Sequence, residues 1–133
     1  MPTVEEAIAA FGVTVDPHLD RQADIPILSG LQFQGDVAVV PADRTPSRTP
    51  VPADGVAVVR GEAGTNTHLL LATGNVCYTP DGLGTVLGVL TVADGATAYL
   101  AHPEHAFSGI GPGTYELRRQ REQGDRETRP VAD

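Results

Sequence analysis

The chain has 133 residues and a formal charge of −8, because 17 acidic residues face 9 basic ones, all of them arginine. So acidic a chain repels phosphate backbones, and we expect no nucleic-acid partner. No apolar run approaches the ~20 residues of a membrane-spanning helix, and Cys77 is the sole cysteine. We therefore expect a cytoplasmic protein without a membrane anchor or an internal disulfide.

The first 30 residues predict a short helix followed by an extended arm. Thr3 and Glu6 have the spacing of a capping box, and Gly12 is placed to end the helix. Residues 16–29 are polar and contain two prolines, which predicts an extended arm. Because so short a helix is marginal alone, we expect it to pack on its own domain or on a neighbouring subunit.

The rest of the chain predicts strands joined by turns. The 15 glycines and 11 prolines are too many for a helical bundle. Alternating or β-branched runs predict strands at 31–34, 36–40, 56–60, 68–73, 75–79, 85–92, 97–101 and 114–122. Residues 42–52 contain three prolines and predict a flexible connector.

These elements predict an all-β fold, a single small barrel or sandwich of about seven to eight short strands with a short N-terminal helix. We expect the helix and arm to occupy residues 1–30, the β-domain residues 31–123, and a charged tail residues 124–133.

Three of the four histidines lie at strand borders, where side chains from separate strands converge. His68 ends the segment GEAGTNTH, and His102 and His105 lie in AHPEH. Three imidazoles are the ligand set of many open zinc sites, so the cluster is a candidate site for a divalent metal, either zinc, iron or manganese. Asn66 or Glu104 is the expected fourth ligand, although a carboxamide oxygen is a poor ligand for zinc or iron.

The same histidines have a structural alternative, in which they hydrogen-bond to turns and Glu104 pairs with an arginine. If the cluster is catalytic instead, Glu104 or Glu62 is the expected acid–base.

The last predicted strand carries alternating charges. We expect Arg118, Arg119, Arg121 and Glu122 to form an intersubunit interface through salt bridges. The alternative is a solvated face that protects an exposed strand edge from pairing.

The motifs GDV at 35–37, GExxxNxH at 61–68, LAHPEHA at 100–106 and GPGTYELRRQRE at 111–122 follow one another in the chain. This order resembles a sparsely characterised family of short bacterial and phage-associated β-rich proteins, with the pattern GDV, GEVTGHxH, HxEH and GxYxVxRQREY. The matching positions are Gly35, Asp36, Val37, Gly61, Glu62, His68, His102, Glu104, His105, Gly113, Tyr115, Arg118, Arg119, Gln120, Arg121 and Glu122. The resemblance implies a shared histidine site and no particular activity.

The chain departs from that pattern at two positions. Asn66 stands where the pattern has the first histidine of GHxH, and Gln123 stands where it has a tyrosine. The first departure weakens the expectation of a metal.

We therefore expect a non-catalytic β-rich binding or assembly module, homo-oligomeric, whose histidine cluster is either a metal site or a set of hydrogen-bonded side chains that fixes the loops. One alternative is a cupin-like metal-dependent enzyme that uses His68, His102 and His105. Another, implied by the resemblance, is a phage- or conflict-associated accessory protein that binds a partner protein through its N-terminal arm.

Overall fold

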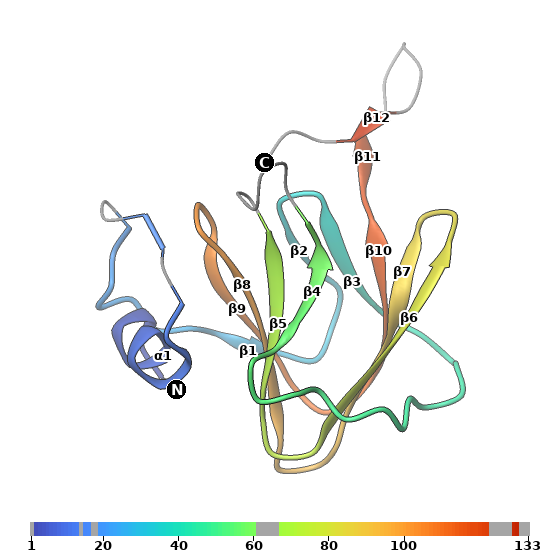
Figure 1. Cartoon of the computed structure of the whole chain (residues 1–133), viewed down its shortest axis with the longest axis horizontal. Helices are drawn as coiled ribbons and strands as arrows, with labels where there is room; N and C mark the ends of the chain where they lie inside the picture. The colour runs from blue at the N-terminus through green and yellow to red at the C-terminus, as the bar shows by residue number, and fades with distance from the viewer. Residues whose placement is uncertain (1, 14, 17–18, 61–66, 123–128, 131–133) are drawn as a thin grey trace.

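A computed structural model of the chain describes residues 2–13, 15–16, 19–60, 67–122 and 129–130. The described strands form two five-stranded sheets that face each other, together with one separate two-stranded pair (Figure 1). The all-β prediction is confirmed as a sandwich, and the sheets do not close into a barrel.

The first sheet has the order β1 (Ile27–Leu28), β9 (Ala106–Ile110), β8 (Thr97–His102), β5 (His68–Thr73) and β4 (Val56–Val59). The second sheet has the order β2 (Gln32–Gln34), β3 (Val37–Pro41), β10 (Gly113–Arg119), β7 (Val86–Val92) and β6 (Val76–Leu83). The two-stranded pair consists of β11 (Arg121–Glu122) and β12 (Arg129–Pro130). One lateral side of the sandwich therefore ends in β1 and β2, and the other side ends in β4 and β6.

The main core lies between the two sheets, where alternate residues of each strand point inward. Leu70, Leu90, Leu100 and Leu117 are wholly buried there. Leucine, valine and alanine fill most of this core, and Tyr115 is its largest fully buried side chain. Inward-facing positions at the ends of strands therefore belong to the core as well, and two of the histidines occupy such positions.

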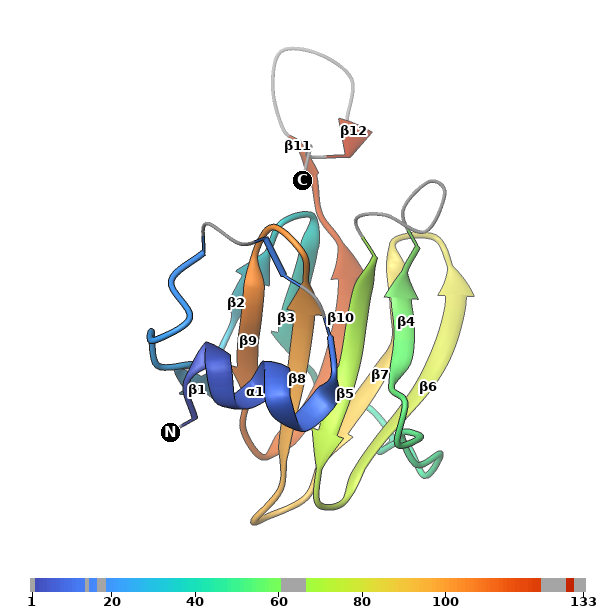
Figure 2. The same ribbon diagram turned by 60° about the vertical axis from the view of Figure 1, so that its left-hand side comes forward.

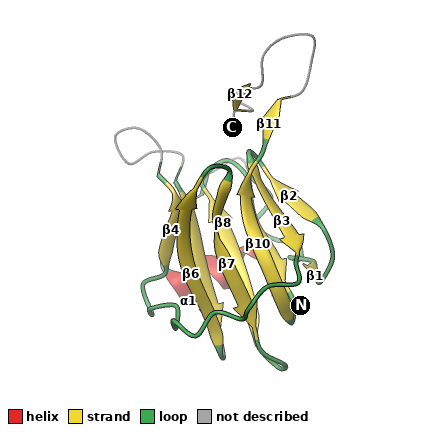
Figure 3. Ribbon diagram, turned by 90° about the vertical axis from the view of Figure 1, so that its right-hand side faces the viewer, coloured by secondary structure: helices red, strands yellow, loops and turns green. Residues whose placement is uncertain are grey.

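A second, smaller core lies under helix α1 (Val4–Phe11), which packs on the outer face of the first sheet (Figure 2). Val4 and Ala7 of the helix are buried against that face, together with Tyr99 of β8. The arm is also packed here, because Val15 and Ile25 are each at most 2% exposed. The helix thus docks on its own domain, whereas no described helix covers the outer face of the second sheet (Figure 3).

The predicted helix signals are confirmed in detail. Thr3 Oγ1 accepts the backbone N–H of Glu6 at 3.2 Å, and Glu6 Oε1 accepts the backbone N–H of Thr3 at 2.8 Å. Gly12 ends the helix with φ of 70°, a conformation that glycine adopts without a Cβ clash. No helix in the described residues is long and apolar enough to span a membrane.

The proline-rich segment 42–52 differs from the prediction of a flexible connector. It runs beside β6, where the carbonyl of Thr49 accepts the Tyr78 N–H at 2.8 Å and the Val51 N–H donates to Val76 at 2.9 Å. Prolines lack the N–H that continues a ladder, so this segment closes the β6 edge. The composition pointed to flexibility, but two backbone hydrogen bonds fix the segment in place.

Candidate functional site

His68 and His102 lie inside the sandwich, at one end of the main core. In the antiparallel register Leu69 pairs with Ala101, which sets the two histidines opposite each other on β5 and β8. His68 lies two residues from the core residue Leu70 on β5, and His102 lies two residues from the core residue Leu100 on β8. Each histidine therefore points to the inward face of its strand. His68 is 0% and His102 1% exposed, and their ring centroids are 4.4 Å apart.

His105 joins this pair from the outside. It lies in the three-residue turn between His102 and Ala106, which pair at the end of the β8–β9 hairpin. Its ring is exposed, 4.5 Å from that of His102 and 6.4 Å from that of His68. The structure therefore brings the three predicted histidines together as one cluster that extends from the core to solvent.

The ligand atoms of His102, Glu104 and His105 lie within 4.8 Å of one another. Glu104 and His105 are exposed, so an ion in solution can reach their side chains. Glu62 and Asn66, the other residues predicted for this site, lie outside the described residues.

The Glu104 backbone also contacts His102 directly. Its N–H donates to Nδ1 of His102 at 3.0 Å, so Nδ1 carries a lone pair and the proton of the neutral ring is on Nε2. In this conformation His102 closes the turn with its side chain, much as Asn and Asp side chains do in Asx turns.

Electrostatics keep His68 neutral. Burial is the largest cause and the charge of His102 the next, and together they lower the pKa of His68 to about 4. The negative charge of Asp36 acts in the opposite direction. His68 is therefore a neutral imidazole at pH 7.

Two polar residues near this end of the core were not predicted as site residues, Asp36 and Gln34. Asp36 lies in the two-residue turn between β2 and β3, is 7% exposed, and its carbonyl accepts the Gln120 N–H at 2.6 Å. Gln34 is 4% exposed and donates to the Leu100 carbonyl at 2.8 Å. The GDV motif at 35–37 was the sequence signal that could have placed Asp36 here.

A cavity of about 220 Å³ lies beside the cluster on the outer side of the first sheet. Its lining is mostly apolar, and the lining residues are Val13, Thr67, Leu69, Ala101, His102 and Pro103. The cavity has room for a small group next to His102.

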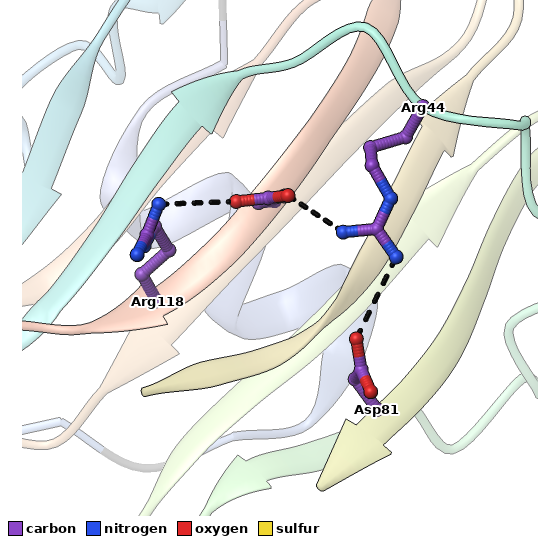
Figure 4. Close-up of polar contacts among 4 residues, drawn as sticks. Arg44, Asp81 and Arg118 are labelled. Carbon is purple, nitrogen blue, oxygen red and sulfur yellow. Dashed lines mark hydrogen bonds and ion pairs between the residues drawn. The ribbon is translucent and has the colours of Figure 1, made fainter. Parts of the chain in front are cut away.

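The predicted arginine interface lies partly on the open face of the second sheet. Arg118 is exposed and pairs with Glu116 at 3.2 Å, and Glu116 also pairs with Arg44 at 2.6 Å (Figure 4). Arg44 reaches Asp81 at 3.6 Å, and these carboxylates raise the pKa of its guanidinium. Arg119 is half-buried, and the side chains of Arg121 and Glu122 lie outside the described residues.

A different surface carries the large exposed apolar side chains of the described residues. Leu28 is 47%, Leu31 58% and Phe33 54% exposed. They belong to β1, to the link after it and to β2, and we call them the apolar edge. Because β1 and β2 are the outer strands of their sheets, the apolar edge spans one lateral side of the sandwich.

Comparison with known proteins gives one result. No curated protein and no solved structure matches the chain. A family model described as "Domain of unknown function (DUF8820)" matches residues 33–120, which run from β2 through β10 and include all three clustered histidines. The match covers more than half of the chain, which therefore belongs to this family.

Proposed function

We propose that the protein is a non-catalytic assembly module that associates with a second copy of itself through the apolar edge. The observation that carries the proposal is the exposure of Leu28, Leu31 and Phe33, each about half accessible, on one side of the sandwich. Exposed apolar groups that cluster on one surface are typical of protein interfaces.

Charge supports a second copy as the occupant. The chain carries a net charge of −8, so two copies repel each other over most of their surface. Residues 27–34 contain no charged side chain. Contact through this segment brings two acidic chains together where repulsion is weakest, and a two-fold axis lets one surface meet itself.

The two lateral sides of the sandwich also differ in how far their edge strands are protected from pairing with another chain. The β6 side is closed by segment 49–51, whose Pro50 forms a bridge with Cys77. The β1–β2 side has two short strands and three exposed apolar side chains. An edge without proline or charge is open to pairing with another chain.

Sedimentation of the purified chain over a range of concentrations tests the proposal. We expect a mass that is a multiple of the 13.9 kDa chain. Phe33→Asp should produce monomers, because it places a charge in the apolar contact. Thr45→Asp adds the same charge at an exposed position in the proline-rich segment and should leave the assembly intact.

The same experiment separates the apolar edge from the arginine strand. Arg118→Ala removes an exposed guanidinium of the other predicted interface, and we expect no change of mass. A wild-type chain that stays monomeric at all concentrations would refute self-association. Dissociation by Arg118→Ala but not by Phe33→Asp would move the interface to the second sheet.

The cavity beside His102 favours a second candidate, a cupin-like metal-dependent enzyme. In that function the cavity receives a small, mostly apolar substrate group and Glu104 acts as the acid–base. Metal-dependent turnover that is lost in Glu104→Gln, with the fold and the assembly unchanged, would establish this function over the first.

A further inference from the structure

The β8–β9 hairpin concentrates metal-binding side chains in a tight turn. His102 and Ala106 pair across it, and Ala106 has φ of 61°, in the left-handed region that side chains other than glycine rarely adopt. The ligand atoms of His102, Glu104 and His105, all carried by this hairpin end, lie within 4.8 Å of one another.

The donor set and its exposure fit a transition-metal dication. Two imidazole nitrogens and one carboxylate oxygen suit zinc and its neighbours, whereas magnesium and calcium prefer oxygen ligands alone. In a tetrahedral zinc site, neighbouring ligand atoms are about 3.3 Å apart. Ion binding therefore requires the three ligand atoms to move closer together, and solvent reaches both Glu104 and His105.

The hydrogen bond from the Glu104 N–H to Nδ1 of His102 determines which nitrogen of His102 can bind a metal. A neutral imidazole binds a metal through the nitrogen without a proton, and in this turn that nitrogen is Nδ1, which accepts the Glu104 N–H at 3.0 Å. Binding through Nε2 would require a proton on Nδ1, where it would face the N–H. The metal and the closed turn therefore compete for His102.

We propose that the β8–β9 hairpin is a binding site for one zinc-type dication, held by His102, Glu104 and His105, and that the ion displaces the Glu104 N–H from His102. The His68 ring lies tilted against the His102 ring from the core side, with the ring centroids 4.4 Å apart. Glu104 then contributes twice, because its carboxylate binds the ion while its released N–H turns to solvent. The site does not depend on self-association through the apolar edge.

Titration calorimetry of the chelator-treated full chain with zinc chloride tests the site. We expect one zinc per chain and no magnesium binding. His105→Ala should weaken zinc binding about tenfold or more, and it should fold normally because His105 is exposed. Glu104→Gln keeps the backbone N–H and the length of the side chain, and it should also weaken binding. The matched control is His18→Ala, which removes the remaining histidine and should leave zinc binding unchanged.

Amide hydrogen exchange at Glu104 tests the displacement without reference to any activity. Its N–H is hydrogen-bonded in the metal-free turn, so zinc should speed its exchange. Absence of zinc binding, or equal binding by the wild type and His105→Ala, would overturn the site. Zinc binding that leaves the Glu104 amide protected would overturn the displacement.

Discussion

The backbone N–H of Glu104 donates to Nδ1 of His102 at 3.0 Å, and this bond makes a buried histidine part of a turn. His102 is 1% exposed and pairs with Ala106 at the base of the same hairpin. The ring also lies tilted against the rings of both His68 and His105, so the hydrogen bond fixes the orientation of the central member of the cluster. The turn and the histidine cluster are therefore one structural unit.

Replacement of His102 separates its role in the turn from its role in packing. His102→Ala removes the acceptor, whereas His102→Asn keeps an acceptor at nearly the same place, because Oδ1 of asparagine and Nδ1 of histidine are bonded to the same side-chain carbon. Both variants lose ring packing, but we expect His102→Ala to lose about 1 kcal/mol more of the free energy of unfolding. Urea denaturation at pH 7 with a chelator measures the difference. Equal losses would show that the hydrogen bond does not stabilise the turn.

The low pKa of His68 predicts that acid destabilises the fold. Its pKa is about 4 in the folded chain and ~6.5 when unfolded, so between these values the unfolded chain binds the proton more readily. The stability is complete above the higher value, falls as the pH decreases, and has lost up to about 3 kcal/mol near pH 4. Asp36, His102 and His105 are the other titratable groups that act on this ring.

Urea unfolding of the metal-free chain between pH 4 and pH 8 measures this dependence. In His68→Leu the slope between pH 6.5 and pH 4 should be smaller, since no buried imidazole remains to take up a proton. His105→Ala removes the smallest of the named influences on this ring and serves as the comparison, with the slope nearly retained. An unchanged slope in His68→Leu would assign the acid sensitivity to other groups.

The histidine cluster could be predicted from the sequence because its members lie at the ends of apolar runs that are long enough for strands. Residues 68–73 and 97–101 predict β5 and β8, and the short AHPEH segment adds His105 by proximity along the chain. The capping box at Thr3 and Glu6 could also be predicted, because it depends only on the spacing of residues close together in the sequence.

The features that the sequence did not predict depend on contacts between segments that lie far apart in the sequence. Asp36 acts on the cluster from the turn between β2 and β3 of the second sheet, and apart from the GDV motif no pattern in the sequence indicates this proximity. The sequence does not predict β9, because Gly109 and Gly111 give this segment the composition of a turn. Nor does it predict β1, which lies in the segment expected to be an extended arm. Tertiary pairing overrides that local preference.

Gly109 explains why β9 tolerates a glycine within a strand. A Cβ at this position would lie 2.8 Å from the Pro26 carbonyl oxygen and 2.8 Å from Cγ1 of Ile27, so β1 can approach only because the side chain is missing. We expect Gly109→Ala to destabilise the fold by about 2 kcal/mol. Gly30→Ala is the matched control, since its Cβ would meet no atom within 4 Å.

Urea unfolding measures the loss in Gly109→Ala, and amide exchange locates it. The Gly111 N–H donates to Leu28 at 2.8 Å, so its exchange should speed up if β1 is displaced. Wild-type protection at Gly111 in Gly109→Ala would mean that the strands accommodate the methyl group without separating.

The Tyr115 hydroxyl connects the end of β9 to the segment that carries the apolar edge. It donates to the Gly111 carbonyl at 2.8 Å, and the Ser29 side chain hydrogen-bonds to it from the link between β1 and β2. Burial raises the pKa of Tyr115, so the group remains a neutral hydroxyl at physiological pH. Tyr115→Phe should lower the free energy of unfolding by about 1.5 kcal/mol, because it leaves a buried carbonyl without its donor. Ser29→Ala removes only the bond to the link, so it should have a smaller effect. Equal effects of the two variants would place the whole stabilisation in the Ser29 contact.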